Sequence, residues 1–189
     1  MFRIGRVAGL GWLLFLGCSP ASKKPLGKGP FDPKEYIDVN SHLVFESRDV
    51  MRTPYFMYRI SLVNGRRDSA VVSSEEFARW QTFLFNHNML AGDTGTWYRE
   101  STFGDTLTGF VTTTYSAEQP ELPIRSISVL SSPESGFIKH VYVSKQYRAG
   151  DSTVLEKLGW NAGKSLMVNR SIQGAEGASR NEQTTLYWQ

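Results

Sequence analysis

The chain has 189 residues, of which 40% are hydrophobic, and its formal net charge is +3. The excess positive charge lies in the first 35 residues, because residues 36–189 hold 15 Lys and Arg against 16 Asp and Glu, a net charge of −1. Nucleic-acid binding needs a basic face that displaces counterions from phosphates, so this composition excludes it.

The first eighteen residues, MFRIGRVAGLGWLLFLGC, have the layout of an export signal. Arg3 and Arg6 form a basic start, residues 7–16 form a short apolar run, and the small residue Gly17 comes before Cys18. The run is too short for a membrane span, which needs about 20 apolar residues. A plain secretory signal and a structural N-terminus remain as alternatives.

The segment Leu14-Phe15-Leu16-Gly17-Cys18 resembles the lipobox of bacterial lipoproteins. The resemblance implies that residues 1–17 are a signal peptide removed from the mature protein and that the sulfur of Cys18 carries diacylglycerol. It also implies that Ser19 directs the protein to the outer membrane of a diderm bacterium. Cys18 is the only cysteine, so its lipidation would leave no thiol for disulfides, metal binding or catalysis.

Residues 18–35 follow as a lipidated N-terminus and a tether. Residues 19–35 contain four prolines, two glycines and four lysines with little apolar surface, a composition typical of an extended linker. The lysines are either solvated or lie against anionic headgroups. Residues 36–189 are then predicted to form a single globular domain.

The domain begins with two segments of alternating apolar residues, which predict strands over about 37–45 and 56–62. Asn64-Gly65 follows, and this dipeptide between apolar runs predicts a tight hairpin because both turn residues need positive φ. A third strand is expected over about 66–72.

One helix is predicted after these strands. Ser73 and Glu76 have the spacing of a capping box, in which each side chain accepts a hydrogen bond from the backbone N–H of the other residue. An apolar stripe follows at helical spacing, and Gly92 marks the latest point at which the helix could end. The stripe consists of Phe77, Trp80, Phe83 and Leu84.

Seven further extended runs follow, each bounded by turn residues. They cover about 97–103, 107–116, 123–130, 137–147, 152–160, 165–172 and 183–189. Evenly spaced short strands joined by tight turns favour an antiparallel meander. The predicted fold is therefore mainly β (α+β), with a curved antiparallel sheet or incomplete barrel of about 7–10 strands packed on one helix.

No motif predicts a catalytic residue, a cofactor or a metal ligand. Residues 159–165 approach a phosphate-binding loop, but they have three residues between the glycines where that loop has four, so a hairpin turn is favoured. The three histidines, His42, His87 and His140, are too far apart in sequence to begin a zinc site. Glu100 and Asp105 are interpreted as a strand acid and a turn acid.

Three functions are compatible with this sequence. The favoured one is a non-catalytic binding or assembly module of the envelope, anchored through Cys18, with an envelope protein or an apolar ligand as its partner. The second is a lipid or lipoprotein carrier with an apolar groove between sheet and helix, a plan similar to that of the lipoprotein-localisation factors. The third is a hydrolase with a dispersed site formed by Glu100, His140 and a serine.

Overall fold

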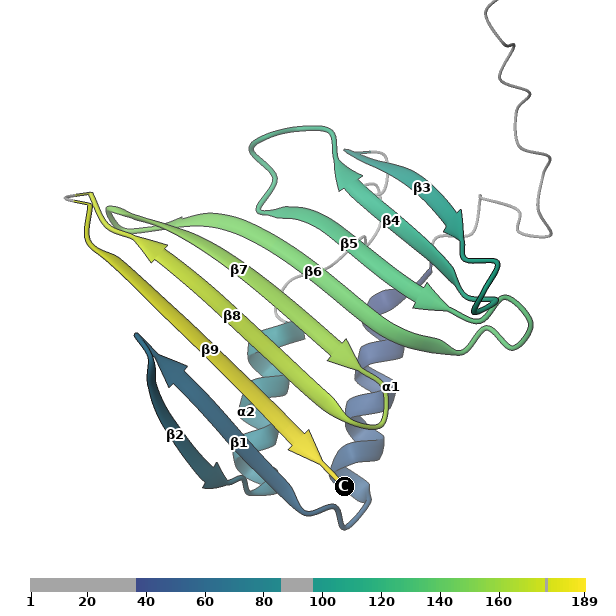
Figure 1. Cartoon of the computed structure of the whole chain (residues 1–189), viewed down its shortest axis with the longest axis horizontal. Helices are drawn as coiled ribbons and strands as arrows, with labels where there is room; N and C mark the ends of the chain where they lie inside the picture. Colours follow the sequence, from purple (N-terminus) through teal and green to yellow (C-terminus); the bar gives the residue numbers. More distant parts are fainter. Residues whose placement is uncertain (1–36, 86–96, 176) are drawn as a thin grey trace, which may run out of the picture. The chain divides into compact units, whose positions relative to one another are not determined.

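The computed structural model describes residues 37–85, 97–175 and 177–189, all within one compact unit, Pro33–Gln189. These residues form two helices and nine strands (Figure 1). In chain order the elements are α1 (Val39–Arg52), β1 (Met57–Val63), β2 (Arg66–Val71), α2 (Ser74–Phe85), β3 (Tyr98–Gly104), β4 (Val111–Ala117), β5 (Ile124–Ser131), β6 (Ile138–Ala149), β7 (Ser152–Asn161), β8 (Ser165–Gln173) and β9 (Ser179–Trp188).

The nine strands form one antiparallel sheet with the order β2-β1-β9-β8-β7-β6-β5-β4-β3. Strands β3 to β9 follow one another as a meander, and β9 then pairs with β1, so the first hairpin extends the end of the meander (Figure 1). The sheet does not close, because β2 and β3 each have a single neighbour. The seven predicted C-terminal strands and the Asn64-Gly65 hairpin are confirmed, and both hairpin residues have positive φ.

The first predicted strand, over about 37–45, is wrong. Residues Val39–Arg52 form α1, so two helices pack on the sheet instead of one. Val39, Leu43 and Val50 recur at helical spacing and are buried, whereas Phe45 remains 70% exposed. The carboxylate of Asp38 accepts a 2.9 Å hydrogen bond from the backbone N–H of Ser41 and caps the helix.

The second helix, α2, begins as predicted but uses its capping box differently. The Ser73 hydroxyl accepts a hydrogen bond from the backbone N–H of Glu76. The Glu76 carboxylate pairs with Arg59 on β1, with 2.6 Å between Nη1 and Oε1, and so joins the helix to the sheet. Phe77 is buried and Trp80 is half-buried.

Several predictions concern residues or side chains outside the described part of the chain and remain predictions. These are the signal and tether with Cys18 and Ser19, the side chains of Phe83 and Leu84, His87, and the limit at Gly92.

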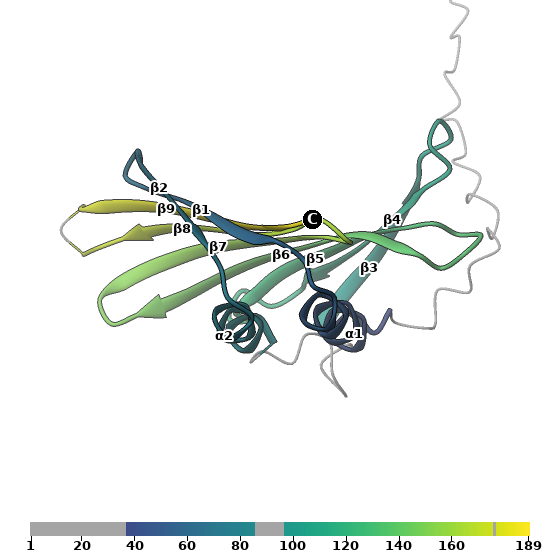
Figure 2. The same ribbon diagram turned by 90° about the horizontal axis from the view of Figure 1, so that it is seen from below.

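Both helices lie against the same face of the sheet (Figure 2). We call this the helix-covered face and the other the open face. Residues directly opposite each other on antiparallel strands point to the same face, so the register assigns every strand residue to one of them. The core consists of α1 and α2 residues together with inward residues of the central strands. The N-terminal end of α1 is also attached to β4, since Ile37 N–H donates to the Tyr115 hydroxyl.

Aromatic side chains fill the space between the helices and the sheet. Trp160 and Trp188 are 4% and 3% exposed, and their ring centroids are 5.2 Å apart. Phe77 of α2 contacts Trp188 edge to face at 5.7 Å. Rings packed in this way contribute their buried area and a further 0.5–1.5 kcal/mol per pair, roughly. These tryptophans therefore belong to the core.

The helical assignment of α1 makes a direct prediction. A strand would place Leu43 and Phe45 on one face, whereas the helix buries the first and exposes the second. Leu43→Ala is expected to lower the free energy of unfolding by about 2–5 kcal/mol, because it leaves a cavity in the core. The matched control Phe45→Ala is expected to change it by about 0.5 kcal/mol or less. Urea titration of both variants measures this, and comparable losses would contradict the assignment.

Candidate functional site

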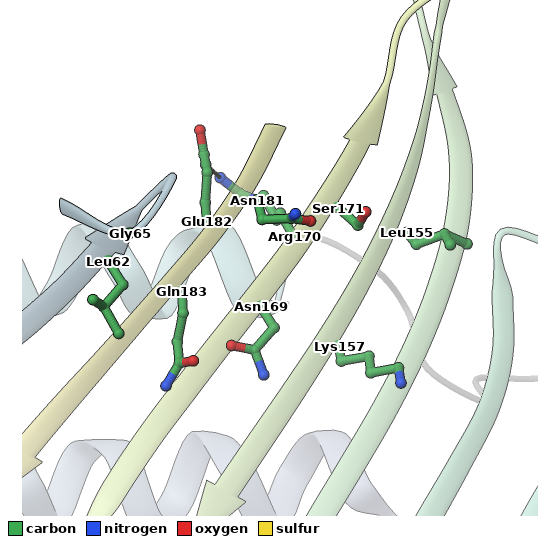
Figure 3. A pocket seen from close by; sticks show the side chains of 10 residues that line it. All are labelled: Leu62, Gly65, Leu155, Lys157, Asn169, Arg170, Ser171, Asn181, Glu182 and Gln183. Atoms are coloured by element: carbon green, nitrogen blue, oxygen red, sulfur yellow. Dashed lines mark ion pairs between the residues drawn. The ribbon is translucent and has the colours of Figure 1, made fainter. Parts of the chain in front are cut away.

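The open face carries a hollow over β7, β8 and β9, next to the turn between β1 and β2 (Figure 3). Its volume is about 540 Å³, and we call it the amide hollow. Three carboxamides line it together with a hydroxyl, a lysine and two leucines, and Arg170 and Glu182 contribute to its wall. The lining consists of Leu62, Gly65, Leu155, Lys157, Asn169, Arg170, Ser171, Asn181, Glu182 and Gln183.

The strand register explains why the carboxamides gather there. Gln183, Asn169 and Lys157 are directly opposite one another on β9, β8 and β7, so they form one row across the open face. Asn169 has a buried Oδ1 for which no hydrogen-bond partner is found among the described residues. Carboxamides both donate and accept hydrogen bonds, and the hollow can therefore match hydroxyl and amide groups of a ligand.

An aromatic side chain stands beside this hollow. Tyr142 on β6 is opposite Gly159 on β7, which lies two residues after Lys157 on the same face. A Cβ atom on Gly159 would come 3.3 Å from Cε1 of Tyr142, so the glycine leaves room for the ring against the sheet. His140 stacks on Tyr142 with 5.8 Å between ring centroids, and the tyrosine remains 49% exposed. The ring thus offers a supported apolar surface to the solvent.

The helix-covered face carries a second feature behind this hollow. Glu182, Arg170, Glu156 and Lys145 are opposite one another on β9, β8, β7 and β6, and their charges alternate across four strands. We call this row the charge ladder. Nε of Arg170 lies 2.7 Å from the Glu156 carboxylate, and Nζ of Lys145 lies 3.6 Å from its other oxygen. Both side chains of the Lys145–Glu156 pair are at most 2% exposed.

Burial is the largest influence on the pKa of Lys145 in the ladder. It lowers the pKa of Lys145, because the ammonium loses its hydration, and the Glu156 carboxylate opposes this shift. Burial also raises the pKa of the Tyr147 phenol, whose hydroxyl is 3.5 Å from Glu156. Removing one partner from a buried ion pair typically costs about 3–5 kcal/mol, since the other charge is left uncompensated. Lys145 and Glu156 are therefore expected to depend on each other for stability.

The residues proposed for a dispersed hydrolase site are not brought together. Glu100 on β3 belongs to the row of Tyr115 and therefore to the helix-covered face, whereas His140 belongs to the open face. Burial raises the pKa of Glu100, and a hydrogen bond from Tyr115 opposes the rise. Burial is the main cause that lowers the pKa of His140, which is consistent with a neutral imidazole stacked on Tyr142.

The other candidate residues of the sequence lie in turns or on a helix. Asp105 is a turn residue, as predicted, because its carboxylate accepts from the Leu107 backbone N–H and the Thr108 hydroxyl. Residues 159–165 form the predicted hairpin, with Gly163 at positive φ. His42 lies on α1, where burial lowers its pKa. No group of three possible metal ligands occurs in the described parts of the chain.

The charge ladder was missed because its four members come from four strands, and only the pairing register places them opposite one another. The available signal is the hairpin turn at residues 162–164, which sets the β7–β8 register and places Glu156 opposite Arg170. Charged residues at inward positions of two strands joined by a tight turn predict a buried pair. Over residues 37–85, 97–175 and 177–189, neither helix has the length and apolar composition of a membrane span.

The site and the fold together define an open antiparallel sheet with helices on one face and a polar hollow on the other. A scan against protein-family models and searches of curated proteins and of solved structures found no match for this chain.

Proposed function

We propose that this protein is a non-catalytic binding module of the bacterial envelope and that the amide hollow binds a saccharide. The observation that carries this proposal is the pairing of a carboxamide-lined hollow with the exposed Tyr142 ring beside it. Sugars present hydroxyl groups at their edges, which carboxamides match, and C–H groups on their faces, which pack on aromatic rings. Lys157 adds a hydrogen-bond donor between the hollow and the Tyr142 ring.

The carrier function has less support from the described residues. A carrier needs an apolar groove between the helices and the sheet, but Trp160, Trp188 and Phe77 pack there against one another. Buried aromatic packing of this kind favours a permanent core over a space that exchanges lipid.

Attachment through Cys18 is part of the same proposal and rests on the lipobox-like sequence. A diacylglycerol on the cysteine, with a further acyl chain such as palmitate on the new N-terminus, would anchor the domain lastingly. A single acyl chain binds membranes only marginally, whereas two or more give stable anchoring. The tether of residues 18–35 would then separate the domain from an outer membrane.

The saccharide proposal predicts binding of an N-acetylglucosamine oligomer, which carries both hydroxyl and amide groups. Tyr142→Ala should weaken binding by about tenfold, because loss of the stacking surface is worth about 1.4 kcal/mol. Gly159→Ala should weaken it too, since its new Cβ crowds the Tyr142 ring. Thr112→Ala, on β4 of the same face and outside the hollow, is the matched control. Calorimetric titration measures the affinities. Equal binding by all variants, or no binding by the wild type, would contradict the proposal.

The attachment proposal predicts the location of a Cys18 variant. Cys18→Ala should move the protein from the membrane fraction to the soluble fraction, because the acceptor of the lipid is lost. Ser22→Ala, a nearby change in the tether, should leave it with the membrane. Fractionation of expressing cells, with the mass of the N-terminal peptide, measures both outcomes. A Cys18→Ala protein that stays in the membrane fraction would rule out this anchor.

A further inference from the structure

A second hollow lies on the helix-covered face, between α2 and the sheet. Its volume is about 500 Å³, and three of its five lining residues are arginines. They come from three different elements, with Arg59 on β1, Arg79 on α2 and Arg170 on β8, and the lining is completed by Glu76 and Trp80. We call this hollow the arginine crevice.

The periodicity of α2 explains why this helix contributes three residues to the crevice. Arg79 and Trp80 follow Glu76 by three and four residues, so the three side chains share one side of the helix. Glu76 is held against the sheet by its 2.6 Å contact with Arg59. The same contact therefore brings Arg79 and Trp80 to the edge of the crevice, where the indole is half-buried and supplies an apolar wall.

The charges in the crevice are only partly balanced. Arg59 is paired with Glu76 and lies 3.5 Å from Asp68, and Arg170 is paired with Glu156 in the charge ladder. Arg79 makes no ion pair with any residue in the described part of the chain. Arg79 is exposed and its charge acts on Glu75 without forming an ion pair, so its guanidinium is accessible to a ligand.

One buried donor group in the crevice also lacks a partner within the described residues. Nε of Arg59 is buried and has no hydrogen-bond partner among the described residues, although Nη1 of the same side chain is paired. A buried donor without a partner destabilises the fold, and a ligand acceptor would remove that cost.

We propose that the arginine crevice is a binding site for a phosphate monoester. Guanidinium groups from three elements surround one space, an arrangement that suits a tetrahedral oxyanion better than a planar carboxylate, which a single arginine can satisfy. Arg79 supplies an exposed guanidinium, Arg59 supplies its buried Nε–H, and Arg170 adds a third positive charge, while the organic part of the ligand packs on Trp80. This site is on the opposite face from the amide hollow and does not depend on the saccharide proposal.

The phosphate can belong to a free metabolite or to a lipid headgroup, and two probes distinguish these sources. The purified domain is titrated with glycerol phosphate by calorimetry, and its binding to vesicles that contain phosphatidic acid is measured by sedimentation. Binding of glycerol phosphate indicates a free ester, and binding of the vesicles alone indicates a headgroup. Either result supports the site, provided that it shows the variant pattern below, and binding of neither probe at concentrations up to about 10 mM phosphate overturns it.

Variants keep this test specific. Arg79→Gln removes an exposed arginine that forms no ion pair within the described residues, so it should leave the fold intact while it lowers the affinity for phosphate by about tenfold or more. Trp80→Leu keeps an apolar side chain against the core and removes no charge, so it should lower the affinity for glycerol phosphate but leave that for inorganic phosphate nearly unaffected. Arg148→Gln removes an exposed arginine from the open face and is the charge-matched control. Equal losses in Arg79→Gln and Arg148→Gln would show nonspecific attraction and overturn the proposal.

Discussion

The charge ladder is the constraint on which the arrangement of both hollows depends. It places a buried lysine and a buried glutamate beside the hydrophobic core, and Arg170 joins Glu156 to Glu182 on β9. Burying these charges is costly, so their value lies in the register that they require. If β8 slipped by two residues along β7, Arg170 would face Val154 or Leu158, and Glu156 would lose the partner that lies 2.7 Å away. One register therefore satisfies the ladder, and that register aligns the carboxamides on the other face.

Side chains alternate along each strand, so the two faces of this sheet differ in chemistry although they are formed by the same strands. Asn169 and Ser171 line the amide hollow on the open face, while Arg170, between them, belongs to the ladder and contributes to both hollows. Binding surfaces built on strands are more rigid than those on loops, since the backbone hydrogen bonds are already made. The same alternation separates Glu100 from His140, which is why a sheet rich in polar residues does not assemble those two into one site.

Much of the sheet could be predicted from the sequence, because turn residues such as Asn64-Gly65 and Gly163 require particular backbone angles and so mark the ends of strands. The first helix could not, since Val39, Leu43 and Phe45 fit alternation over a short window as well as they fit a helix. The capping contact of Asp38, the burial of Val50 and the exposure of Phe45 distinguish the two, and all three are seen only in the structure. The hollows could not be predicted either. Their residues come from strands distant in sequence, and the pairing of β9 with β1, which brings Leu62 beside Gln183, follows no local signal.

The coupling between Glu156 and Arg170 tests the central role of the ladder most directly. A double-mutant cycle with Glu156→Gln and Arg170→Gln measures it from the free energies of unfolding of four proteins. If the ladder acts as a unit, the coupling energy will be about 2 kcal/mol. The exposed pair Arg99–Glu118, which joins β3 to the end of β4, serves as the reference and is expected to give about 0–1 kcal/mol. A coupling for Glu156–Arg170 no larger than that of the exposed pair would contradict the account.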